Sequence, residues 1–159
     1  MTIKYNNVFI EDAYTICGNY ENDGPLSKYF DKKYEKDLYF GEKSWEQAEV
    51  HLLKEANTNI LKKNKLKEED IDLLISGDLQ NQIAASNYMA REFNIPFLGI
   101  FEACSTSGEG LAIGSTYIEG GFAKRILVST SSHNMAAEKQ FRNPTEYGTP
   151  KPKLSLIHI

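Results

Sequence analysis

Residues 97–121 read FLGIFEACSTSGEGLAIGSTYIEGG, and this stretch decides the fold. The uninterrupted apolar run 97–101 predicts a buried strand, and the residues after it predict a helix that ends at the glycine pair Gly120 and Gly121. Cys104 therefore lies at a strand-to-helix turn. Unpaired N–H groups and the dipole at a helix start stabilise negative charge, so Cys104 is a candidate nucleophile. The alternative is a free cysteine that fills space beside the strand.

Two further apolar runs flank this stretch, at residues 73–75 before it and at 126–130 after it. Helical patterns cover 83–93 and 103–121, so strands and helices alternate. Strands that are apolar throughout predict a parallel sheet covered by helices on both faces, and hence the α/β class. A short strand is also predicted at 8–10 and a turn at 22–25.

Another helix is predicted over residues 44–63. Ser44 and Gln47 have the spacing of a helix cap, and apolar residues recur every three or four positions after them. The expected buried stripe is Trp45, Ala48, Leu52, Ala56 and Ile60.

The helix after Cys104 contains three glycines, Gly108, Gly110 and Gly114. Each costs about 1 kcal/mol relative to alanine, so their small size must be needed for close contact, and we expect a second helix to pack there. A buried helix with a cysteine at its start resembles the centre of the thiolase fold. That fold has two similar halves, and by this resemblance the chain supplies only the first.

Composition excludes several classes of protein. The chain has 159 residues, 41% of them hydrophobic and 25% charged, which is typical of one soluble globular domain. The net charge is -4 and the basic residues are scattered, so we expect no nucleic acid partner. No apolar run is long enough to span a membrane, and the polar N-terminus is not a secretory signal, so we expect the cytosolic side. Cys17 and Cys104 predict two free thiols and neither a disulfide framework nor a metal site.

The last six residues, LSLIHI at 154–159, resemble the translation of a sequencing adapter. We expect them to be non-native and exclude them from the fold. Residues 1–153 are then one domain, and since the segment before the tail has no helix or strand period, we expect the native protein to be longer.

A series of motifs carries a resemblance to a known family. They are DGPL at 23–26, SWEQAE at 44–49, EEDIDLLISGDLQNQ at 68–82, IPF at 95–97, EACSTS at 102–107, GGFAKR at 120–125, TSSHN at 130–134 and QFRNPTEYG at 140–148. In this order they are similar to the stage V sporulation protein AD family, over about 8–152. The resemblance implies a thiolase-like protein of spore-forming bacteria with no known acyl-transfer role.

The same resemblance implies the function. Family members bind dipicolinic acid, pyridine-2,6-dicarboxylate, as soluble components of the membrane machinery that moves this compound with calcium into the spore. It implies peripheral association with the cytoplasmic side of the forespore or spore inner membrane, other proteins of the dipicolinate channel as partners, and a homodimer through the thiolase-type interface. No cofactor or metal is implied. Cys104 matches the thiolase nucleophile and would line a binding pocket.

A planar dianion requires cationic or N–H donors around an apolar slot. The candidate ligand-binding residues are Cys104 with its helix start, His133 and Arg142, because the last two follow the strand 126–130. The alternative for His133 is a turn histidine bonded to neighbouring backbone, and for Arg142 a surface or dimer-interface ion pair. Asp78 and Asn81 also lie in a loop at the carboxyl end of a strand.

Two functions from different classes remain open. One is a ligand-binding accessory protein of transport. The other is an acyl-transferring condensing enzyme, like a thiolase or ketoacyl synthase, with Cys104 as the nucleophile. Its His/His or His/Asn partners would lie in the second half of the fold. A cysteine hydrolase finds no support, since the remaining histidine before the tail, His51, lies in the middle of a predicted helix.

Overall fold

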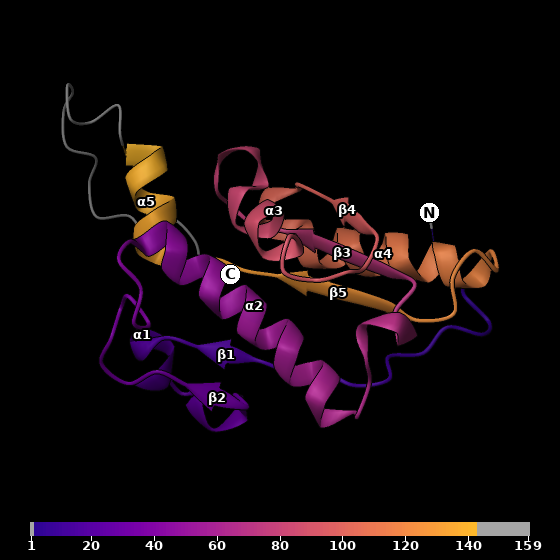
Figure 1. Ribbon diagram of the computed structural model, residues 1–159, viewed down its shortest axis with the longest axis horizontal. Coiled ribbons are helices and arrows are strands. Elements are labelled where there is room, and N and C mark those ends of the chain that lie inside the picture. Colours follow the sequence, from indigo (N-terminus) through magenta and orange to yellow (C-terminus); the bar gives the residue numbers. More distant parts are fainter. Residues whose placement is uncertain (1, 143–159) are drawn as a thin grey trace.

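The computed structural model describes residues 2–142, and the side chains of residues 138 and 140–142 lie outside the description. The helices and strands follow in the order β1 (Ile16–Cys17), α1 (Asn19–Asn22), η1 (Ser27–Tyr29), β2 (Lys32–Lys33), α2 (Trp45–Lys63), η2 (Glu68–Asp70), β3 (Leu73–Gly77), η3 (Asn81–Ile83), α3 (Ala84–Ala90), β4 (Phe97–Gly99), η4 (Ala103–Ser105), α4 (Thr106–Glu119), β5 (Ile126–Thr130) and α5 (Asn134–Arg142). Figure 1 shows their arrangement. The predicted α/β class is confirmed.

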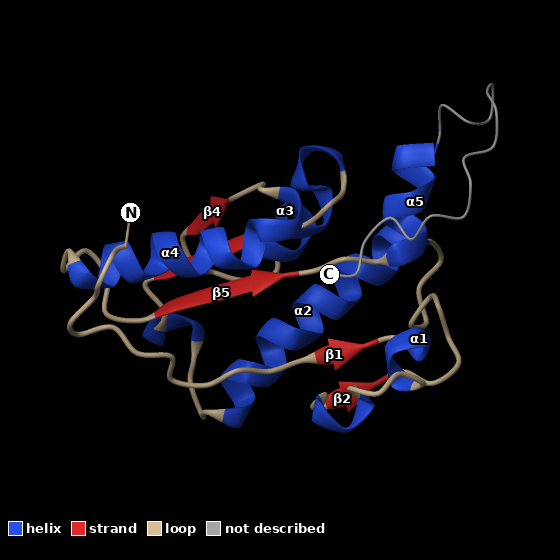
Figure 2. Cartoon of the chain, turned by 180° about the vertical axis from the view of Figure 1, so that it is seen from behind, coloured by secondary structure: helices blue, strands red, loops and turns tan. Residues whose placement is uncertain are grey.

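The three predicted apolar runs form one parallel sheet in the order β4-β3-β5. Helix α4 covers one face of this sheet, and α2 and α3 lie on the other (Figures 1 and 2). Leu74 and Ile75 are adjacent in the central strand, point to opposite faces and are both fully buried. Because the central strand is buried on both sides, its sequence is apolar without alternation.

Helix α2 begins and ends where predicted, but its buried face is shifted. The Oγ of Ser44 accepts a hydrogen bond from the Gln47 N–H at 3.2 Å, and the helix ends at Lys63. The buried residues are Ala48, Glu49, Leu53, Asn57 and Leu61, so apart from Ala48 the predicted stripe was wrong by one position.

The buried face of α2 is shifted because the helix is covered on two sides. Figure 2 shows α2 between the large sheet and the small sheet of β1 and β2. On one side it packs against α3 and the large sheet. On the other side, Glu55, Asn59 and Lys63 make polar contacts with the N-terminal segment, by which we mean the residues before α2. Their partners are Tyr34, Tyr14 and Ala13. The spacing of apolar residues cannot show which of them face the core when two faces of one helix are covered.

The strand predicted at residues 8–10 is wrong. These residues belong to no strand, and Phe9 and Ile10 are 82% and 77% exposed. The short strands β1 and β2 pair with each other instead, in a separate parallel sheet. Directly after residues 8–10, the carboxylate of Glu11 accepts two hydrogen bonds from the Arg125 guanidinium.

The glycines of α4 have two different environments. A Cβ on Gly110 would lie 2.7 Å from Cγ1 of Val128, and one on Gly114 would lie 3.4 Å from Cγ2 of the same residue. The small size of these two glycines is therefore needed where α4 packs against the sheet. The prediction that they contact a second helix is wrong. A Cβ on Gly108 would meet no neighbouring atom within 4 Å, because this residue faces away from the sheet.

We expect Gly110→Ala to lower the free energy of unfolding by about 1–3 kcal/mol, because overpacking outweighs the gain in helix propensity. Urea titration followed by circular dichroism measures this. The cost should shrink in a Val128→Ala background, which removes the methyl groups that the new side chain meets. An equal cost in both backgrounds would contradict the packing explanation.

Candidate functional site

The loops after β3, β4 and β5 converge at one end of the sheet, which we call the carboxyl edge (residues 78–83, 100–106 and 131–133). Gly77 lies at its centre. A Cβ there would collide with the carbonyl oxygen of Ile100 and lie 2.5 Å from Cγ2 of Thr106. The Ser131 N–H donates to the Gly77 carbonyl at 3.3 Å. Glycine at this position therefore lets the Cys104 turn approach the two neighbouring loops.

Cys104 lies in η4, directly before α4, and its thiol is exposed. Cys104 therefore lies between a strand and a helix, as predicted, and it is exposed in this chain. Ala103, directly before it, has a left-handed φ of 44°. This conformation costs an alanine about 1–2 kcal/mol. The Thr106 hydroxyl holds the turn, because it donates to the Ala103 carbonyl at 2.9 Å and accepts from the Glu102 N–H at 3.1 Å.

The start of α4 has no side-chain cap. The N-cap residue, Ser105, turns its hydroxyl to the Glu102 carbonyl at 3.0 Å instead of to a helix N–H group. The turn η4 runs directly into α4, so the Ser105 N–H donates to the Glu102 carbonyl and the Thr106 N–H, the first of α4, donates to the Ala103 carbonyl. What remains for an anion beside Cys104 is the positive end of the helix dipole.

His133 is buried at the carboxyl edge and uses both ring nitrogens. Nε2–H donates to the Leu38 carbonyl at 2.8 Å, and Nδ1 accepts from the Ala136 N–H at 3.3 Å, which fixes the neutral tautomer. Its ring meets Phe40 edge-on, with centroids 5.7 Å apart. These contacts match the alternative in which His133 is a turn histidine bonded to backbone. The residue joins the segment before α2 to the start of α5.

Arg142 is the last residue of α5, and its side chain lies outside the described residues. The structure therefore brings Cys104 and the His133 turn to one edge and leaves the position of the Arg142 side chain a prediction.

Asp78 shapes the loop after β3. It is buried, and its two oxygens accept from the N–H groups of Gln80 and Ser86 at 2.9 and 2.7 Å. Two consecutive residues in the same loop, Gln82 and Ile83, have left-handed φ angles of 59° and 49°. Such conformations in residues with a Cβ are rare and occur preferentially at functional sites.

Glu49 was not among the residues predicted from the sequence. This fully buried residue of α2 accepts hydrogen bonds from Gln80 Nε2 at 2.8 Å and from the Ser131 hydroxyl at 2.9 Å. Burial, together with the negative charge of Asp78, raises the pKa of Glu49 to about 7. The signal that could have revealed it is the i, i+4 spacing of Glu49 with Leu53, which places both on the buried face.

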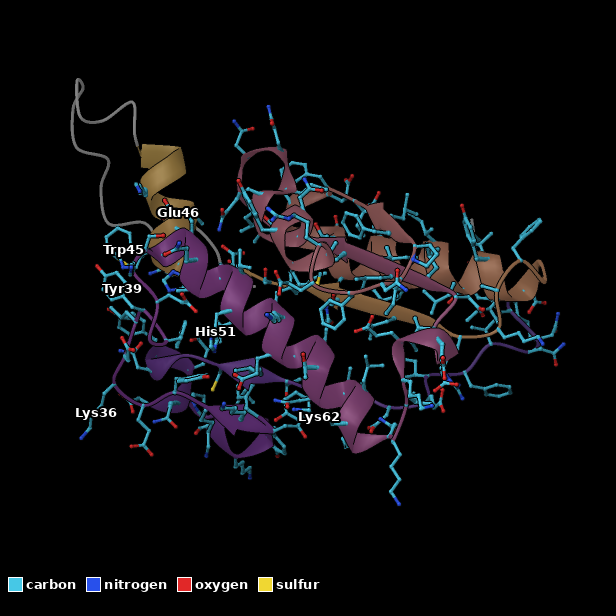
Figure 3. All side chains as sticks on the ribbon, viewed as in Figure 1. Lys36, Tyr39, Trp45, Glu46, His51 and Lys62 are labelled. Atoms are coloured by element: carbon cyan, nitrogen blue, oxygen red, sulfur yellow. The ribbon has the colours of Figure 1, made fainter. Side chains whose placement is uncertain are left out.

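Elsewhere on α2, aromatic residues connect the helix to the N-terminal segment. Tyr39 stacks on Trp45 with centroids 6.0 Å apart, at the helix start visible in Figure 3. His51, further along the same helix, contacts Glu42 at 3.1 Å and the Tyr34 hydroxyl at 3.4 Å. His51 therefore links α2 to the residues before it and does not belong to the carboxyl edge.

Comparison with known proteins identifies the family. The chain matches stage V sporulation protein AD (SpoVAD) over residues 1–158. The chain belongs to this family. It is 52% identical over 145 residues to stage V sporulation protein AD of Bacillus subtilis (strain 168), a match that covers 91% of this chain and 43% of the relative. The chain thus spans less than half the length of that relative.

A solved structure with partial similarity is 3-oxoacyl-[acyl-carrier-protein] synthase III from Aquifex aeolicus VF5. The alignment covers 54% of this chain and 30% of the synthase, with a TM-score of 0.49 and 23% sequence identity. The family assignment rests on the sequence match and not on this similarity.

Residues 2–142 contain no helix that is long and apolar enough to cross a membrane. Within the same range, no group of three or more His, Cys, Asp or Glu side chains is placed to hold a metal ion.

We expect Ala103→Gly to be more stable than the matched change Ala112→Gly by about 1–2 kcal/mol. Glycine relieves the left-handed strain at residue 103 but weakens the helix at residue 112 by about 1 kcal/mol. Urea unfolding of both variants measures the difference. Equal destabilisation would show that the turn before Cys104 is unstrained.

Proposed function

We propose that the full-length protein binds dipicolinic acid as a peripheral component of the spore inner membrane machinery that imports this compound with calcium during sporulation. The observation that carries the proposal is the family match over residues 1–158. Its partners would be the ligand and other proteins of the dipicolinate channel, on the cytoplasmic side of the membrane. The protein would act by binding and not by catalysis.

The carboxyl edge has features suited to this ligand. Dipicolinate is a planar aromatic ring with two carboxylates, so it needs N–H or cationic donors beside an apolar surface. The start of α4 has no side-chain cap and supplies the positive end of the helix dipole, and Phe101, which is 54% exposed, lies just before the Cys104 turn. A helix start contributes typically about 0.3–1 kcal/mol to anion binding, so a stronger donor is also required.

Arg142 is the stronger donor in this proposal. A charge-assisted hydrogen bond contributes about 1.5–3 kcal/mol, and a guanidinium matches the geometry of a carboxylate. His133 has both ring nitrogens bonded to backbone, so its contribution is to position the turn that leads into α5. Direct contact of His133 with the ligand would require one of these bonds to break.

The exposed face of α4 supports the two-half architecture. Gly108, Leu111 and Ala112 are exposed and uncharged on this face, and the chain covers only 43% of its relative. We propose that residues 1–153 form the N-terminal half of a thiolase-like fold, that the second half covers this face, and that the full-length protein is a homodimer. Residues 154–159 lie outside the described residues, and their adapter origin stays a proposal.

A second candidate function is acyl transfer through a Cys104 thioester. The exposed thiol at an uncapped helix start, after the left-handed Ala103, favours it. A thioester mechanism also needs a base near the thiol. Neither histidine of the described residues supplies one, because His133 is bonded to backbone and His51 is bonded to Glu42 and Tyr34.

We expect full-length protein to bind dipicolinate in calorimetric titration, and Arg142→Ala to weaken binding by about tenfold or more. Cys104→Ala should change the affinity little, because the cysteine side chain supplies no cationic contact to the two carboxylates. Unchanged affinity in a folded Arg142→Ala protein would remove Arg142 from the site. No binding by the unmodified protein would overturn the proposed function.

We also expect no acyl-enzyme. Full-length protein incubated with acetyl-CoA and longer acyl-CoA should show no mass increase on the peptide that contains Cys104. The matched control is Cys104→Ala, which separates acylation at this thiol from acylation elsewhere. A stoichiometric adduct that a second substrate discharges would favour the condensing enzyme.

A further inference from the structure

The carboxyl of Glu49 connects three separate parts of the chain. It projects from α2, accepts a hydrogen bond from Gln80 in the loop after β3, and accepts another from Ser131 in the turn after β5. The backbone N–H of His133 in the same turn also donates to it. We call these groups the Glu49 clamp. The clamp joins α2 to two of the three loops of the carboxyl edge.

No cation among the described residues balances this carboxyl. Its hydrogen-bond donors are a side-chain amide, a hydroxyl and a backbone N–H group, all of them neutral. The charged group that acts on it is Asp78, from the loop after β3, and it has the same sign. The ring of His133 faces Leu38 and Ala136 instead. A buried charge with neutral partners and a like charge nearby is costly.

The nearest ion pair on the same helix lies one turn earlier and is satisfied by its own partner. Glu46 binds Lys139 of α5 at 2.7 Å, at the end of α2 labelled in Figure 3. Lys139 therefore does not neutralise Glu49.

Protonated Glu49 can keep all three contacts. The carboxyl O–H donates to the Ser131 hydroxyl, which is both donor and acceptor, and the carbonyl oxygen still accepts from Gln80. Ionised Glu49 keeps the same geometry only with an uncompensated charge in a buried site. The closed arrangement therefore binds a proton more tightly than an arrangement in which water reaches the carboxyl.

We propose that Glu49 is a proton-operated clamp: with its proton bound it holds the loops after β3 and β5 closed, and loss of the proton favours their opening. The sign follows from linkage. The pKa of Glu49 in the closed structure is about 7 against 4.5 for a solvated glutamate, so closure is favoured below 4.5 and loses stability as the pH rises through 7. The effect on ligand affinity rests on the proposed function, whereas the clamp itself does not.

The first arm of the test measures the carboxyl directly in the full chain. Carbon-13 NMR of glutamate-labelled protein should show a side-chain carboxyl that titrates near pH 7, and Glu49→Gln should remove that resonance. Glu46→Gln is the matched control, because it removes a carboxyl from the same helix and should leave the resonance in place. A Glu49 carboxyl that titrates near its ordinary value would overturn the proposal.

The second arm measures opening by amide hydrogen exchange. Relative to intrinsic exchange, protection of the His133 amide should fall about tenfold between pH 6 and pH 8, while that of Leu74 in the central strand stays constant. In Glu49→Gln, which resembles the protonated acid, His133 protection should not depend on pH. Constant protection in the unmodified protein would overturn the clamp, even if the variant fails to fold.

The third arm concerns the ligand. Dipicolinate affinity should be weaker at pH 8 than at pH 6 by the factor by which the closed population falls, which the exchange data give, and this difference should be absent in Glu49→Gln. Affinity that stays constant while the closed population falls would disconnect the clamp from binding. Absence of any dipicolinate binding would contradict the proposed function and leave the first two arms to decide on the clamp.

Discussion

The close approach of three chain segments at Gly77 is the constraint on which the carboxyl edge depends. This residue ends the central strand, and a side chain there would collide with the backbone after β4 and with Thr106 at the start of α4. Because Gly77 has no side chain, the Cys104 turn lies next to the loops that follow β3 and β5. In parallel α/β sheets this is the end at which ligands bind. The structure thus places its exposed thiol and its uncapped helix start where the fold class predicts a site.

Polar contacts hold these loops together. Asp78 accepts two backbone N–H groups, Glu49 joins α2 to the loops after β3 and β5, and His133 joins the segment before α2 to α5. The apolar core lies elsewhere, between α2, α3 and the sheet, around Leu53 and Leu74. Buried polar contacts have specific geometry and respond to protonation, whereas apolar packing does not. The proposed response to pH is therefore confined to the edge and leaves the core unchanged.

The sequence predicted the elements whose signal is local. The runs that became β3, β4 and β5 are apolar because both faces of the sheet are covered, and the Ser44 cap depends on residues three positions apart. The position of Cys104 followed from the same reasoning. The segment at 8–10 has strand composition, but no strand pairs with it among the described residues, and pairing is not a local property. Gln80 and Ser131, the partners of Glu49, and Leu38, the distant partner of His133, lie 31 to 95 residues away in the chain, so these contacts could not be read from spacing.

The central claim is that the carboxyl edge is the ligand site of a two-half protein. Amide chemical-shift mapping of the full-length protein during a dipicolinate titration tests it most directly. The expected shifts saturate together and are largest at residues 104–108 and 131–134, with little change on α3. Saturable shifts confined to other surfaces, such as the outer side of α2 near Lys62, would contradict it.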